Sequence, residues 1–193
     1  SDILNSIGFL YLHGIIFQED KNKAEQYFKK ASDKSNEDAF LNLGNLYFKN
    51  DFYKARYYYD KVIEINESNS NAYAYLGNLF YRIKTPENYI KIYENVKKSA
   101  NLNNINSLNF LGNMHYKGNY CELDFSLGRH YIELSAMQNF TFANNFLGYI
   151  YRTGKGVQQN YAKSKMHYEI ASRKYHASSF YELGSFYSNG EGV

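Results

Sequence analysis

Three asparagines could hydrogen-bond to a bound partner, because each stands directly after a glycine in a short motif that recurs along the chain. They are Asn45, Asn78 and Asn113. An Asn amide carries both a donor and an acceptor, so a row of such side chains can pair with the backbone of an extended peptide. The alternative is that they are solvated positions in a chain that is rich in Asn throughout. Both interpretations are open at the level of the sequence.

The residues that usually carry catalysis or bind metals are few and scattered. The chain has one cysteine, Cys121, and five histidines, with no His pair at i, i+4 and no Cys pair that would suggest zinc. His115 takes the place of a repeated aromatic residue, so we expect it to pack in a core. We therefore expect no catalytic residue, no metal, no cofactor and no small-molecule substrate.

Charge and hydropathy exclude two classes of partner. The 193 residues include 22 Lys and Arg spread among 19 Asp and Glu, for a net charge of +3. A nucleic-acid-binding protein concentrates basic residues on one face, so we expect no nucleic-acid partner. No apolar run approaches the roughly 20 residues that a spanning helix needs, so we expect no direct membrane insertion of this segment.

The elements that would position these residues follow from the recurring motif. It consists of an aliphatic residue, Gly, any residue, an apolar residue and usually an aromatic one. Its six glycines are spaced by 33 to 36 residues, which is typical of helical repeats: Gly8, Gly44, Gly77, Gly112, Gly148 and Gly184. A Gly inside a helix costs about 1 kcal/mol relative to Ala. Its recurrence predicts close approach of a neighbouring helix.

Each motif is followed by a second amphipathic segment, such as the one from Ala24 to Ala31. Helix starts are predicted at Asp20, Asp51 and Asp124, whose side chains can cap exposed backbone N–H groups. Thr85-Pro86-Glu87 predicts another start, with Thr as the cap and Pro at the first helical position.

These residues resemble the Sel-one-like repeat family, a variant of the tetratricopeptide repeat. The best copy combines Leu147-Gly148-Tyr149-Ile150-Tyr151 with the loop Gly154-Lys155-Gly156-Val157. The resemblance implies an all-α fold, a right-handed α-α superhelix (solenoid) of tandem helix-turn-helix repeats. It also implies a scaffold or adaptor for protein–protein interaction, and no enzyme.

The repeats predict one array over residues 1–193, with about five helix pairs and the first helix of a sixth, as part of a longer protein. At the end of this array Leu183, Phe186 and Tyr187 are expected to lack their usual cover.

The family geometry would direct residues three before, one after and four after each motif Gly into a concave groove. The candidate protein- or peptide-binding residues on this rule are Asn45, Asn78, Asn113, Asn109, Asn145, Phe48, Tyr81, Tyr116, Tyr149 and Arg152. A clamp for a C-terminal carboxylate is not expected, because it needs lysines where Leu41, Ala74 and Asn109 stand.

Two functions remain as hypotheses. The first is an adaptor that binds a protein or an extended peptide in the groove. The second is a structural spacer that contacts its neighbours through its ends and its convex face.

Overall fold

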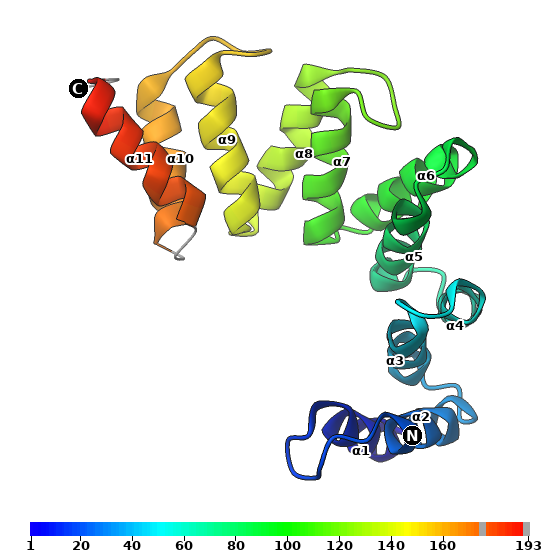
Figure 1. Ribbon diagram of the computed structural model, residues 1–193. Coiled ribbons are helices and arrows are strands. Elements are labelled where there is room, and N and C mark those ends of the chain that lie inside the picture. Colours follow the sequence, from blue (N-terminus) through cyan, green and yellow to red (C-terminus); the bar gives the residue numbers. More distant parts are fainter. Residues whose placement is uncertain (174–176, 191–193) are drawn as a thin grey trace. The chain divides into compact units, whose positions relative to one another are not determined.

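The computed structural model describes residues 1–173 and 177–190 (Figure 1). These residues form eleven α-helices and one short 3-10 helix, and the described part of the chain contains no strand. The chain divides into two compact units, residues 1–95 and 96–193.

Unit 1 is a run of helices in which each of the first four packs against the next along the chain. The 3-10 helix η1 follows the last complete helix of this unit, and α6 begins after it. The elements are α1 (Asp2–His13), α2 (Lys21–Ser32), α3 (Glu37–Tyr47), α4 (Phe52–Ile65), α5 (Ser70–Ile83), η1 (Pro86–Asn88) and the first part of α6 (Tyr89–Asn101).

Unit 2 repeats this arrangement, with each helix from α8 to α11 packed against the one before it. Its helices after the end of α6 are α7 (Ile105–Lys117), α8 (Phe125–Met137), α9 (Thr141–Thr153), α10 (Tyr161–Ser172) and α11 (Ala177–Asn189).

The motif glycines allow a large side chain of the following helix to lie directly on the helix backbone. A Cβ atom added to Gly44 would lie 2.3 Å from the Tyr59 ring, and one added to Gly148 would lie 2.7 Å from the Tyr168 ring. At Gly112 an added Cβ would come within 2.5 Å of the Ile132 side chain and within 2.7 Å of the Gly128 carbonyl oxygen. The predicted close approach is confirmed, and at Gly44 and Gly148 an aromatic ring makes it.

The small residues five positions before the motif Gly are buried in every copy that has one, which lets the helices meet closely. Their side chains are at most 4% exposed: Ala39, Ala72, Ser107, Ala143 and Ser179. His115 is also buried, as predicted, at 7% exposure.

The predicted caps at Asp20, Asp51 and Asp124 are confirmed, because each carboxylate accepts a hydrogen bond from a backbone N–H three residues later. The prediction at Thr85 is confirmed in part. Thr85 is the N-cap residue and Pro86 the first residue of a helix, but this helix is the 3-10 helix η1, and the α-helix starts at Tyr89. The Thr85 side chain makes no cap hydrogen bond. The Thr85 hydroxyl accepts from the Asn88 side chain at 3.0 Å.

Asparagine caps several helices, a role that the motif alone did not indicate. Asn36, Asn69 and Asn104 begin α3, α5 and α7, each accepting from the backbone N–H three residues on, and Asn160 does the same for α10. Part of the high Asn content is therefore explained by helix capping.

The expectation that Phe186 lacks cover is wrong. Its side chain is 1% exposed, because the rings of Tyr161 and Tyr168 in α10 contact it edge-on. Tyr187 is 61% exposed, as expected, and Leu183 is partly buried.

None of the described helices combines the length and the apolar character needed to cross a membrane.

Candidate functional site

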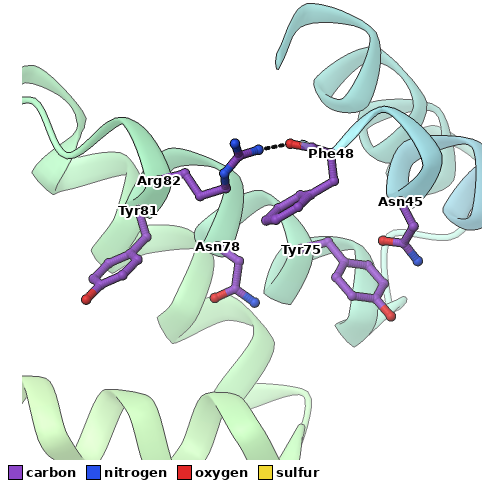
Figure 2. A pocket seen from close by; sticks show the side chains of 6 residues that line it. All are labelled: Asn45, Phe48, Tyr75, Asn78, Tyr81 and Arg82. Atoms are coloured by element: carbon purple, nitrogen blue, oxygen red, sulfur yellow. Dashed lines mark hydrogen bonds between the residues drawn. The ribbon is translucent and has the colours of Figure 1, made fainter. Parts of the chain in front are cut away.

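A pocket of about 520 Å³ lies between α3 and α5 in unit 1 (Figure 2). This size falls within the usual range for ligand sites. Four of the predicted binding residues line it, Asn45, Phe48, Asn78 and Tyr81, together with two that the sequence rule did not include, Tyr75 and Arg82.

The orientation of the Asn45 amide is fixed by a hydrogen bond from a buried tyrosine, Tyr59. Tyr59 is fully buried, and its hydroxyl donates to Asn45 Oδ1 at 2.8 Å. Burial raises the pKa of Tyr59 well above its usual value, so this hydroxyl stays protonated and remains a donor. Because Oδ1 is engaged, Nδ2 of the exposed Asn45 side chain is the group available to a partner.

Phe48, the C-cap residue of α3, and Arg82 of α5 form the upper wall in Figure 2. The Arg82 guanidinium donates to the backbone oxygens of Phe48 and Lys49, and its central carbon lies 4.9 Å from the centre of the Phe48 ring. These contacts hold the cation in place over the ring.

Asn78 and the two tyrosines of α5 complete the pocket. The Asn78 side chain is exposed and makes no hydrogen bond within the described part of the chain. The Tyr75 ring stacks on Tyr59 at 5.4 Å, and Lys84 lies 4.6 Å above the Tyr81 ring. Three aromatic walls therefore surround an amide that can both donate and accept.

The lining residues carry one positive charge and no negative charge. They offer hydrogen-bond donors, one amide acceptor and aromatic area, and they include no His, Cys, Ser, Asp or Glu that could act as a nucleophile or general base. This composition fits binding of a partially apolar segment.

Asn109 and Asn113 belong to α7 in unit 2, and both are partly buried. Asn109 Oδ1 is buried without a hydrogen-bond partner among the described residues. Asn113 makes no hydrogen bond within the described structure.

The remaining predicted residues of unit 2 make contacts within the unit. Tyr116 is 2% exposed and its hydroxyl donates to Lys155 O at 2.8 Å, so it offers almost no surface to a partner. Asn145 Nδ2 donates to Ser179 Oγ at 2.9 Å. Tyr149 is 44% exposed, and Arg152 forms an ion pair with Glu182.

Tyr75 and Arg82 were missed because the rule took only the positions three before, one after and four after the Gly. Helix geometry places residues three before and four after Asn78 on its own face. Widening the face by these two positions would have found both residues.

Cys121 and His115 lie close together, with Sγ 3.5 Å from Nδ1. Burial raises the pKa of the Cys121 thiol, which opposes formation of the nucleophilic thiolate. Across residues 1–173 and 177–190 no group of three or more His, Cys, Asp or Glu side chains could hold a metal ion.

Comparison with known proteins agrees with the repeat pattern. The Sel1 repeat family matches residues 4–36, 41–64, 105–140, 141–176 and 178–193. The stretch from 65 to 104, which holds the third copy of the motif, lies outside these matches. The comparison with curated proteins finds no match.

Several solved structures share the fold. A Sel1 repeat protein from Oxalobacter formigenes is 25% identical, with a TM-score of 0.86 over 97% of this chain and 78% of that one. A protective antigen of uropathogenic Escherichia coli with the SLR fold is 23% identical, with a TM-score of 0.82; the alignment covers all of this chain but 42% of the antigen.

Helicobacter pylori cysteine rich protein B is 25% identical, with a TM-score of 0.54 over 70% of this chain and 96% of that one. The predicted all-α solenoid of tandem helix pairs is thereby confirmed. With matches along most of its length, the chain belongs to the Sel1 repeat family.

Proposed function

We propose that this chain is a non-enzymatic adaptor that binds an extended segment of a partner protein in the pocket of unit 1. Sel1 repeats commonly mediate protein–protein interaction, and scaffolds of this family are generally non-catalytic. The observation that carries the proposal is that Asn45 Nδ2 and the Asn78 amide lie in one pocket with three aromatic rings.

An extended segment suits this pocket because its backbone presents donors and acceptors along both edges. Asn45 Nδ2 can donate to a carbonyl oxygen, and the Asn78 amide can pair with an N–H and a carbonyl together. Phe48, Tyr75 and Tyr81 provide rigid area for side chains at a small entropic cost.

The test is affinity capture from source lysate with the wild-type chain and with the double variant Asn45→Ala/Asn78→Ala. A matched control, Asn22→Ala/Asn106→Ala, removes two exposed helical asparagines that make no hydrogen bond among the described residues. Circular dichroism first establishes that all three proteins have equal helicity.

We expect a protein that is captured by the wild type and by the control, and lost by the pocket variant. A synthetic segment of that protein should then compete for binding. Equal capture by all three chains would contradict a role for the pocket.

The exposed face of α11 favours a second candidate, the structural spacer. An added Cβ at Gly184 would meet no atom within 4 Å, whereas the other motif glycines described above face a ring or backbone. Phe180, Tyr181 and Tyr187 are each more than half exposed on this helix. Loss of a captured protein in Tyr181→Ser/Tyr187→Ser, with capture intact in the pocket variant, would favour this candidate.

A further inference from the structure

We propose that the segment bound in the unit 1 pocket carries an Asp or Glu side chain next to an apolar one, and that Arg82 binds this carboxylate. The inference rests on the proposed function and names the chemistry of its partner.

The Arg82 guanidinium is positioned but not neutralised. It has five N–H donors, of which two are used by the backbone oxygens of Phe48 and Lys49. Both acceptors are uncharged, and Arg82 forms no ion pair with any residue that the structure describes. Three donors and a full positive charge therefore remain on an exposed group whose orientation is already fixed.

Unit 2 contains an arginine in similar surroundings that does have its carboxylate. The guanidinium of Arg152 lies 5.2 Å from the centre of the Phe186 ring, close to the 4.9 Å between Arg82 and Phe48. Its Nη1 pairs with the Glu182 carboxylate and its Nη2 donates to Ser185 Oγ. In this chain, therefore, an arginine that lies on a Phe ring binds a carboxylate when a carboxylate is within reach.

The charges around the pocket favour a negatively charged segment. No acidic side chain lines it. A second cation lies at its edge, because the Lys84 ammonium is 4.6 Å from the centre of the Tyr81 ring. A carboxylate that enters the pocket would be attracted by Arg82, and no Asp or Glu that lines the pocket would compete with it for the guanidinium.

The apolar part of the ligand follows from the walls around Arg82. Phe48 lies between Arg82 and Tyr75 in Figure 2, and Asn78 points into the same space. A carboxylate at Arg82 therefore places the neighbouring residue of an extended segment among the Phe48, Tyr75 and Tyr81 rings. Contact with these rings requires an apolar or aromatic side chain at that position.

The experiment selects binders from a display library of random eight-residue peptides with both ends blocked, so that no terminal carboxylate takes part. Enriched peptides are resynthesised in pairs that differ by Glu→Gln or Asp→Asn at each acid. Their affinities are measured by fluorescence anisotropy on the wild-type chain, Asn45→Ala/Asn78→Ala, Arg82→Gln and the control Arg152→Gln.

We expect enriched peptides to carry an acid beside an apolar residue, and the acidic member of each pair to bind the wild type at least about fivefold more tightly. This preference should vanish in Arg82→Gln and persist in Arg152→Gln, whose arginine already holds Glu182. Raising the salt concentration should weaken the preference in the wild type.

Two failures have different meanings. Peptides that need Asn45 and Asn78 but bind equally in acid and amide form would overturn the carboxylate inference and leave the proposed function standing. If no enriched peptide depends on Asn45 and Asn78, the proposed function is wrong, and the role of Arg82 falls with it.

Discussion

Glycine at the motif position has its clearest role at Gly44, where the fully buried Tyr59 ring occupies the space of a missing side chain. The same ring orients Asn45 through its hydroxyl and stacks on Tyr75. One glycine therefore supports both the packing of α3 on α4 and two walls of the pocket. Gly184 has the same place in the motif but open space around it. A substitution there changes helix propensity without changing the packing, so it can be compared with one at Gly44.

We predict that Gly44→Ala destabilises the chain and Gly184→Ala stabilises it. The new Cβ at residue 44 would lie 2.3 Å from the Tyr59 ring. Overpacking of this kind costs roughly 1–3 kcal/mol, which outweighs the gain in helix propensity of about 1 kcal/mol. At residue 184 the propensity gain stands alone. Urea unfolding of both variants measures the change in the free energy of unfolding, and changes of the same sign would contradict the packing account.

A second prediction concerns His167, whose Nδ1–H donates to Asn144 Oδ1 at 3.1 Å while its ring stacks on Tyr151. Burial, with Lys163 nearby, lowers the pKa of His167 in the folded chain. The unfolded chain then binds a proton as the pH falls through about 6.5, while the folded chain does not, so stability decreases there.

The comparison is urea unfolding of the wild type and His167→Gln at about pH 7.5 and about pH 5.5. The wild type should lose more free energy of unfolding between these two values than the variant does. An equal loss in both proteins would show that His167 does not contribute to the pH dependence.

At the scale of the helix, capping decides where each repeat begins. Aspartates cap α2, α4 and α8, and asparagines cap α3, α5, α7 and α10. Thr85 has the composition of a cap but makes no such bond, and the chain forms η1 there before α6 begins. The residue type alone did not distinguish the aspartates that cap a helix from Thr85, because a capping side chain must also direct its oxygen at a free backbone N–H.

Asp51→Ala should therefore lower the free energy of unfolding by about 1 kcal/mol, the usual cost of losing an N-cap. Its carboxylate accepts from Lys54 N at 3.0 Å at the start of α4. Thr85→Ala should change stability much less, because it removes no cap bond. Thermal or urea unfolding compares them, and an equal cost at both sites would contradict the assignment of caps.

The sequence predicted the helical repeats well, but it predicted only some of the residues that line the pocket. The glycine spacing and the helical stripes identify the repeats, because backbone periodicity and burial act on many residues at once. The same periodicity singled out Asn45 and Asn78 together with Asn113, which belongs to unit 2. The position of Arg82 over Phe48 was not, since it depends on one side chain reaching the carbonyl oxygens at the end of another helix.

At the scale of the whole molecule, the chain is a Sel1 repeat protein whose two units use similar residues differently. In unit 2, Asn145 and Arg152 make bonds to α11, and Tyr116 is buried. In unit 1, Asn78 and part of the Arg82 guanidinium remain available in a pocket. This contrast leads us to place the binding function in unit 1 and to regard Asn145 and Arg152 as contacts that hold neighbouring repeats together.

The most direct test of this placement is site-specific photo-cross-linking in source lysate. Benzoylphenylalanine replaces Tyr81 in the pocket or, as a control, Tyr53, which is 81% exposed on α4 outside it. We expect a cross-link from residue 81 to one continuous segment of a single partner, absent from residue 53 and lost when Asn45 and Asn78 are changed to Ala. Cross-links from residue 53 alone, or from residue 81 regardless of these asparagines, would contradict this placement.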